Sequence, residues 1–90
     1  MKQNDSPTGL EFPCRYPVKA MTPVREYALE QVISVIVRHT RAFDRDSVRV
    51  RPSRNGRFQS ITVEIEAESR SQLEALYADL RGLDIVVMTL

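Results

Sequence analysis

The stretch at residues 49–67, RVRPSRNGRFQSITVEIEA, decides the fold because two alternating segments flank the pair Asn55-Gly56. Asn-Gly is favoured in the two-residue type I′ hairpin turn, in which both central residues take positive φ angles. A turn at these residues places Val50 directly opposite Ile61. The apolar side chains of both strands then share one face and the polar ones the other, and a slip of one residue would destroy this separation. The sequence therefore predicts an antiparallel hairpin with one buried face.

Length and composition indicate a single globular domain. The chain has 90 residues, of which 42% are hydrophobic and 28% are charged, an ordinary balance for such a domain. We expect a loose polar tail over residues 1–11 and one domain over residues 12–90. No stretch approaches the roughly 20 apolar residues of a membrane-spanning helix, and the first residues lack the apolar segment of a signal peptide. The single cysteine, Cys14, excludes an internal disulfide bond and is typical of a reducing cytosol, so we expect a cytoplasmic protein without a membrane partner.

The order of the expected elements gives the fold class. The expected ranges are residues 16–21 for the first strand, 23–40 for the first helix, 46–68 for the hairpin, 69–82 for the second helix with its caps, and 84–90 for the last strand. Right-handed crossovers then lead to an α+β, ferredoxin-like (ACT-like) βαββαβ sandwich. Its four-stranded antiparallel sheet has the order 4-1-3-2, and both helices cover one face.

Capping residues mark where both helices are expected to begin. Thr22-Pro23 combines a hydroxyl cap with a proline at the first helical position, which predicts a helix that starts at Pro23. Ser69 and Gln72 have the spacing of a capping box, which predicts the start of the second helix.

Charge is distributed unevenly along the chain, although the net charge is only +1. Residues 38–57 hold seven arginines and two aspartates, whereas residues 64–84 hold six carboxylates and two arginines. Solvated faces explain much of this asymmetry, and Arg49 and Glu64 are expected to be diagonal neighbours across the hairpin. The asymmetry can also steer an oppositely charged partner, including a second copy of the chain. The residues expected to bind a protein partner, on the open sheet face and the hairpin, are Lys19, Arg49, Arg51, Arg54, Arg57 and Phe58.

The last strand is expected to be an edge that pairs with another chain. It is short, apolar and uncharged from residue 85 to residue 90, and an unprotected edge of this kind invites pairing. A homodimer formed by edge pairing is therefore expected. The residues expected to pair are Ile85, Val86, Val87 and Met88.

No set of residues in the sequence predicts catalysis. His39 is the only histidine and Cys14 the only cysteine, whereas a zinc site needs three or four ligands. The carboxylates are dispersed at surface spacing rather than paired for acid–base chemistry. Small acylphosphatases share the expected topology, but their phosphate-binding loop would fall at residues 21–24, which hold no glycine. We therefore expect no catalytic residue, no metal site and no cofactor.

Two other kinds of binding module remain open. RNA-recognition modules have this topology and stack bases on the open sheet face, but Phe58 alone is a poor stacking platform, so nucleic acid is the less favoured partner. ACT-type sensor domains bind amino acids near a glycine-bearing turn before the first helix. Pro23 occupies that region here, which disfavours an amino acid but leaves another small-molecule ligand open.

A resemblance to one family covers nearly the whole domain. The residues that carry it are Phe12-Pro13, Tyr16, Lys19, Met21, Arg38-His39, Arg51-Pro52-Ser53, Asn55-Gly56, Ser60, Leu76-Tyr77, Ile85-Val86 and Met88 to Leu90. With these residues the chain resembles the DUF493 family of YbeD-like proteins, also called UPF0250, although Thr22 replaces the family's usual glycine after the methionine. The resemblance implies an ACT-like ferredoxin fold in a small cytosolic bacterial protein, with a regulatory role linked to lipoate metabolism. Our hypothesis from the sequence is thus a small non-enzymatic regulatory or protein-interaction module.

Overall fold

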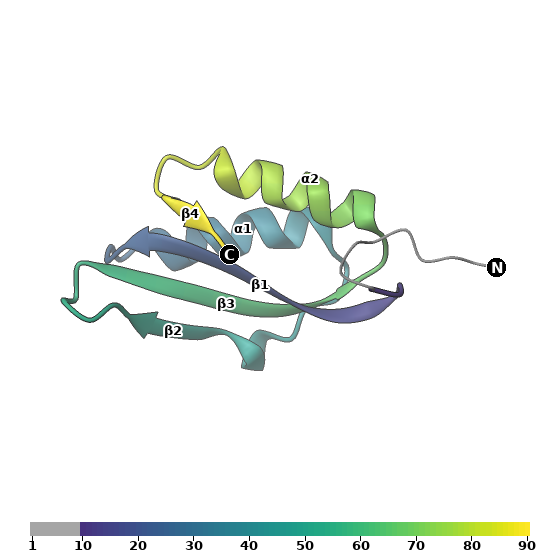
Figure 1. The fold of residues 1–90 in the computed structure, drawn as a ribbon, viewed down its shortest axis with the longest axis horizontal. Helices are drawn as coiled ribbons and strands as arrows, with labels where there is room; N and C mark the ends of the chain where they lie inside the picture. Colours follow the sequence, from purple (N-terminus) through teal and green to yellow (C-terminus); the bar gives the residue numbers. More distant parts are fainter. Residues whose placement is uncertain (1–9) are drawn as a thin grey trace.

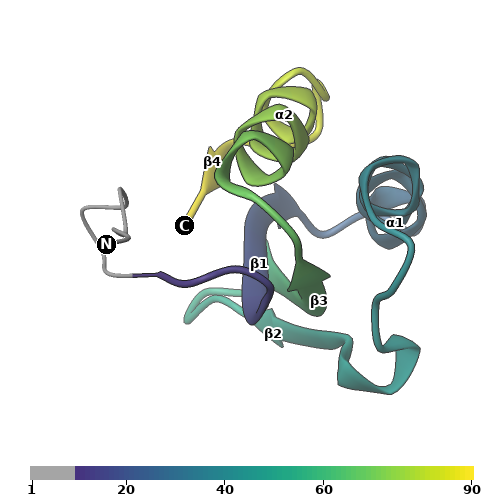
Figure 2. The ribbon, with the colours of Figure 1, turned by 90° about the vertical axis from the view of Figure 1, so that its right-hand side faces the viewer.

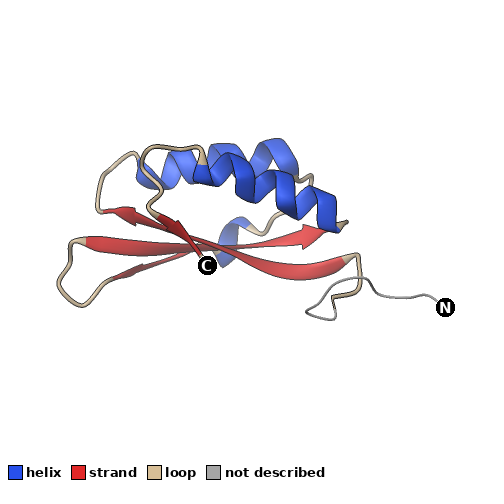
Figure 3. Cartoon of the chain, turned by 45° about the horizontal axis from the view of Figure 1, so that its top comes forward, coloured by secondary structure: helices blue, strands red, loops and turns tan. Residues whose placement is uncertain are grey.

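A four-stranded antiparallel sheet with two helices on one face forms the domain (Figures 1 and 3). The computed structural model describes residues 10–90. The elements are β1 (Cys14–Pro23), α1 (Ala28–His39), the 3-10 helix η1 (Arg45–Ser47), β2 (Arg49–Pro52), β3 (Phe58–Ala67), α2 (Arg70–Arg81) and β4 (Met88–Thr89). The strand order β2-β3-β1-β4 confirms the predicted ferredoxin-like α+β fold. Residues 1–9 of the expected tail lie outside the described residues, and Leu10 packs against the core.

The hairpin has the predicted register but a different turn. Val50 pairs with Ile61, and Arg49 pairs with Thr62, as expected. The predicted type I′ turn is wrong, because of the two central residues only Gly56 has a positive φ, of 75°. Instead, the Gly56 N–H donates to the Ser53 carbonyl at 3.0 Å, and the Asn55 side chain accepts a hydrogen bond from the Arg57 N–H at 3.0 Å. The Asn55 side chain thus holds the turn with its own backbone at negative φ.

The first helix begins at Ala28, five residues later than predicted. Pro23 is the last residue of β1, where it pairs with Phe58, and Thr22 is fully buried and pairs with Gln59. The Thr22 hydroxyl donates to the Pro23 carbonyl at 2.8 Å and accepts a hydrogen bond from the Gln59 side chain at 3.3 Å. The predicted cap is therefore wrong, because β1 stays paired with β3 along the full ten residues and Thr22 serves the sheet.

The core lies between the sheet and the two helices, as Figure 2 shows end-on. Alternate residues of β1 and β3 point toward the helices and are buried, as the period-two pattern predicted. Burial of a large aliphatic side chain is worth roughly 1.5–3 kcal/mol, so this one layer supplies much of the driving force for folding. The largest buried side chains are Ile36, Ile61, Ile65, Leu76, Leu80, Val18, Val32, Val35 and Val63.

The start of α2 is fixed by the predicted capping residues. Ser69 Oγ accepts a hydrogen bond from the Gln72 N–H at 3.0 Å. The Gln72 side chain accepts one from the Glu68 N–H at 2.6 Å and donates another to the His39 carbonyl at 2.8 Å. Gln72 therefore ties the last turn of α1 to the first turn of α2. His39 makes a second link, since its Nε2 lies 2.6 Å from a carboxylate oxygen of Asp79 on α2.

The last strand is much shorter than the predicted range 84–90. β4 contains only Met88 and Thr89, which pair with Met21 and Ala20. The preceding residues form a turn, in which the Val86 N–H donates to the Leu83 carbonyl at 3.1 Å, and Ile85 is buried in the core. Burial of Ile85 between the helices and the sheet removes the segment from the sheet edge, so the predicted strand boundaries are wrong.

Candidate functional site

The sheet face opposite the helices collects most of the predicted binding residues. The register aligns Lys19 of β1, Thr62 of β3 and Arg49 of β2 in one row. The next row contains Ser60 between Met21 and Arg51. Neighbouring strands lie about 4.8 Å apart, so a cation stands on either side of the Thr62 hydroxyl. The structure thus places Lys19, Arg49 and Arg51 on one surface.

These three cations keep their positive charge uncompensated within the described part of the chain. Lys19, Arg49 and Arg51 are exposed, and no ion pair between residues 10 and 90 includes any of them. The hydroxyls of Ser60 and Thr62 lie between them and can donate hydrogen bonds. Cations and hydroxyl donors together form a surface that favours anions.

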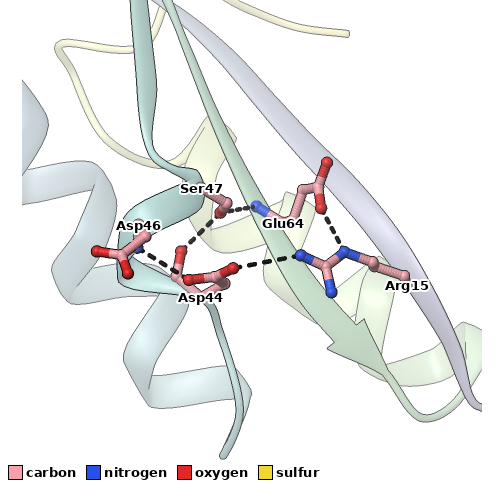
Figure 4. Close-up of polar contacts among 5 residues, drawn as sticks. All are labelled: Arg15, Asp44, Asp46, Ser47 and Glu64. Carbon is pink, nitrogen blue, oxygen red and sulfur yellow. Dashed lines mark hydrogen bonds and ion pairs between the residues drawn. The ribbon is translucent and has the colours of Figure 1, made fainter.

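At the opposite end of the same face, Arg15 pairs with two carboxylates (Figure 4). The Arg15 guanidinium donates to Glu64 through Nε, and its Nη2 lies 3.3 Å from Asp44 Oδ2. The hydrogen bond to Glu64, and then the charge of Glu64, raise the pKa of Arg15. Glu64 is a diagonal neighbour of Arg49 in the hairpin, as predicted, but its ion pair is with Arg15. The arginines of β2 are therefore left without that carboxylate.

A serine hydroxyl holds the segment before β2 onto β3. The Ser47 hydroxyl accepts a hydrogen bond from the Glu64 N–H at 2.9 Å and donates one to the Asp44 carbonyl at 2.6 Å. The Asp44 carboxylate accepts from the Asp46 N–H at 2.9 Å, which caps η1. The backbone of Asp44 also donates to the Glu64 carbonyl at 3.1 Å. Figure 4 shows that the hydrogen bonds of the Ser47 hydroxyl and the Asp44 carboxylate form one network with the Arg15 ion pairs. The network fixes the position at which β2 begins.

The remaining predicted residues of the partner-binding set lie at the hairpin tip. Arg54 and Arg57 are exposed on the turn. Phe58 is half-buried, pairs with Pro23 and belongs to the open face by its register. The tip therefore extends the positive surface of the open face toward one end of the sheet.

The predicted edge residues do not form one strand. Ile85 and Val86 belong to the turn that packs against the core, and Val87 precedes β4. Only Met88 lies in β4, where it pairs with Met21 on the open face. Val87 and Met88 are 54% and 50% exposed, so they form a small apolar margin beside β1.

Sequence reasoning missed Arg15, although a signal for it was present. Arg15 lies four residues before Lys19 on one strand, and this even spacing places both on the same face. The spacing does not predict that Asp44 forms an ion pair with Arg15, because Asp44 lies in a loop whose path depends on tertiary contacts. Among residues 10–90, no cluster of three histidine, cysteine or acidic side chains has a metal-binding arrangement, and no helix there is long and apolar enough to cross a membrane.

Comparison with known proteins shows to which family the chain belongs. The model of DUF493, described as a protein of unknown function, matches residues 7–90. The chain belongs to the DUF493 family. A UPF0250 protein of Azotobacter vinelandii is 44% identical over 82 residues, which cover 90% of this chain and 89% of the relative. A UPF0250 protein of Ectopseudomonas mendocina is 44% identical over 85 residues, which cover 93% of this chain and 92% of the relative. The resemblance expected from the sequence is confirmed, and the names of these bacterial relatives state no activity.

A solved structure shows the same fold. Protein HP0495 from H. pylori, known from a solution structure, has a TM-score of 0.75 with 20% sequence identity, and the match covers 100% of this chain and 94% of that protein. The similarity supports the ferredoxin-like arrangement of this DUF493 member and concerns the fold alone.

Proposed function

We propose that this DUF493 protein is a non-enzymatic module that binds an acidic surface of a partner protein. The binding surface is the basic face, defined as Lys19, Arg49 and Arg51 on the open sheet with Arg54 and Arg57 at the hairpin tip. The observation that carries the proposal is the separation of charge on the open face. Arg15 pairs with Glu64 and Asp44 at one end, whereas the three cations at the other end have no ion pair within residues 10–90.

The shape of the basic face favours a protein over a small molecule. The basic face is the outer surface of β1, β3 and β2 with the hairpin turn, and four grooves within residues 10–90 are lined by residues other than Lys19, Arg49 and Arg51. Small ligands prefer concave sites that bury most of their surface. A broad positive surface instead raises the rate of encounter with a negative one. The small-molecule sensor is therefore the second hypothesis, and a metabolite that raises the melting temperature would favour it.

We propose that the protein regulates the partner to which it binds. The family resemblance implies a regulatory role linked to lipoate metabolism, and binding to an acidic protein of that metabolism would provide it. Probing captured proteins with an antibody against protein-bound lipoate checks this part separately. We also propose that the protein acts in the cytoplasm, which the reducing environment expected for Cys14 supports.

The test is capture of partners from the native cell with two variants of matched charge. Arg49→Glu with Arg51→Glu reverses two charges of the basic face, and Arg25→Glu with Arg41→Glu reverses two exposed charges elsewhere. Neither pair touches the core, so the free energy of unfolding should change by about 0.5 kcal/mol or less per substitution. We expect the first pair to weaken binding of the captured and purified partner at least tenfold, and the second to leave it nearly unchanged.

Salt gives an independent readout of the same interaction. Between about 0.01 M and 0.1 M salt the Debye length falls from about 30 Å to about 10 Å, so the association rate with an acidic partner should fall steeply. Equal affinity for the partner in wild type and in Arg49→Glu with Arg51→Glu would reject the basic face. The expected homodimer is checked by sedimentation at high micromolar concentration, where a monomer alone would reject self-association.

A further inference from the structure

Among residues 10–90, no strand neighbours half of β1 on one side. β1 pairs with β3 along all ten residues, whereas β4 pairs only with Ala20 and Met21. The side of residues 14–18 that faces away from β3 therefore continues the line of β4, and no strand of the described chain pairs with it (Figure 1). We call this side of residues 14–18 the free edge.

The free edge presents backbone groups in the geometry of a strand. The Lys19 and Met21 carbonyls accept hydrogen bonds from the N–H groups of Leu90 at 3.1 Å and Val87 at 2.9 Å. The backbone N–H and C=O groups of the odd-numbered residues of β1 therefore point toward the β4 side. By the same alternation the Arg15 N–H, the Arg15 carbonyl and the Pro17 carbonyl point along the free edge. Among residues 10–90, none of these three groups has a hydrogen-bond partner.

A groove lies beside the free edge on its helix side. Its volume is about 420 Å³, and its walls come from the chain before β1, from α2 and from the end of β4. Phe12, Tyr16, Leu73 and Tyr77 supply apolar and aromatic surface, and Arg81 stands at the rim. Tyr77 closes one end, where its hydroxyl donates to the Leu90 carbonyl at 3.3 Å. Tyr16 faces the helices like Val18, so an added strand would direct alternate side chains into this groove.

We propose that the free edge and its groove bind an extended peptide segment of another protein as a fifth strand in line with β4. The peptide donates two N–H groups to the carbonyls of Arg15 and Pro17 and accepts one hydrogen bond from the Arg15 N–H. It places one branched or aromatic side chain in the groove and an acidic side chain beside Arg81. Addition of a strand at a sheet edge combines backbone hydrogen bonds, which give affinity, with a side-chain pocket, which gives specificity.

A second copy of the chain fits the free edge less well. If two β1 edges paired antiparallel about Tyr16, each Arg15 N–H would meet the carbonyl of Pro17 in the other copy. Proline has no N–H, so both Arg15 carbonyls would lack a donor. A peptide without proline satisfies all three groups, and this difference selects another protein's segment over self-pairing.

The experiment begins with a displayed library of random heptapeptides selected on the full chain. We expect enriched peptides with one large apolar residue and a nearby acidic residue. Each amide of a selected synthetic peptide is then N-methylated in turn. Methylation at every second amide, the ones that face β1, should weaken binding at least tenfold, and methylation at the amides between should have little effect. We expect the Arg15 amide to exchange rapidly in the free protein, and binding should slow this exchange.

Variants separate this site from the basic face. Arg81→Glu alters an exposed residue and should weaken acidic peptides severalfold, whereas Arg49→Glu with Arg51→Glu should bind them like wild type. The opposite pattern in the two variants would overturn the proposal. So would a selection that enriches no peptide, an N-methylation series without the alternating pattern, or an Arg15 amide whose exchange does not change at saturation.

Discussion

Replacement of Ser47 by alanine tests whether one hydroxyl fixes the start of the arginine-bearing strand. The Ser47 hydroxyl bridges the Glu64 N–H of β3 and the Asp44 carbonyl, at 2.9 Å and 2.6 Å. It stands where the loop segment around Asp44 gives way to β2, and there it accepts the hydrogen bond of the Glu64 N–H. Ser47→Ala removes both hydrogen bonds and leaves a small space for solvent.

The expected loss follows from the two hydrogen bonds. Each contributes about 0.5–1.5 kcal/mol net, and the backbone of Glu64 is only partly buried, so water compensates in part. We expect Ser47→Ala to lower the free energy of unfolding by about 1–2 kcal/mol. For a domain of this size, each 1 kcal/mol corresponds to about 4–8 °C in melting temperature.

Urea unfolding followed by circular dichroism measures this loss, and hydrogen exchange of the Glu64 amide locates it. Ser34→Ala is the matched control, because Ser34 is an exposed helical residue whose hydroxyl bonds only within its own helix, to the Gln31 carbonyl at 2.8 Å. Alanine is the better helix former, so the control should be neutral or slightly stabilising. If Ser47→Ala matches the control in stability and the Glu64 amide exchanges as in wild type, the bridging role is refuted.

Three further predictions concern the turn, the core and the alkaline range. Gly56→Ala should cost about 1 kcal/mol, since φ is 75° there and a Cβ would meet no atom within 4 Å, so backbone strain is the only penalty; urea unfolding measures it. Leu76→Ala, at a fully buried site, should cost about 2–5 kcal/mol, whereas Val50→Ala, at a site 45% exposed, should cost clearly less; similar losses in both would contradict the core assignment. Burial raises the pKa of Tyr77 to about 12, so its contribution to stability is complete below about pH 10 and is lost as the pH rises through 12. Tyr77→Phe should remove that part of the alkaline loss.

The hairpin register and the buried faces could be predicted because they rest on local alternation. Val50 meets Ile61 whichever turn closes the hairpin, provided that the number of residues between the strands is unchanged. The same alternation placed Lys19 and Arg49 on the open face. A period of two is a property of neighbouring residues, and a slip of one residue would turn the charged side chains toward the core.

The boundaries could not be predicted because distant contacts outweigh local preference there. Thr22-Pro23 has the local form of a helix start, yet pairing with Gln59 and Phe58 keeps both residues in β1. The apolar run before Met88 has the local form of a strand, yet burial of Ile85 under the helices withdraws it from the edge. Local propensities differ by about 1 kcal/mol or less per residue, and burial of one aliphatic side chain is worth more than that.

The binding surface depends on the same distinction between local and distant contacts. The sequence contains the charge asymmetry, but a count of charges does not say which remain available. In the folded chain the Glu64 carboxylate has two arginines as neighbours, Arg15 of β1 and Arg49 of β2. It forms its ion pair with Arg15. Arg15 is also held by Asp44, so two carboxylates converge on one guanidinium, and this arrangement keeps them away from β2. A positive surface therefore arises on a chain with a net charge of only +1, because two of the nearby acidic groups, Asp44 and Glu64, pair with Arg15 at the other end of the sheet.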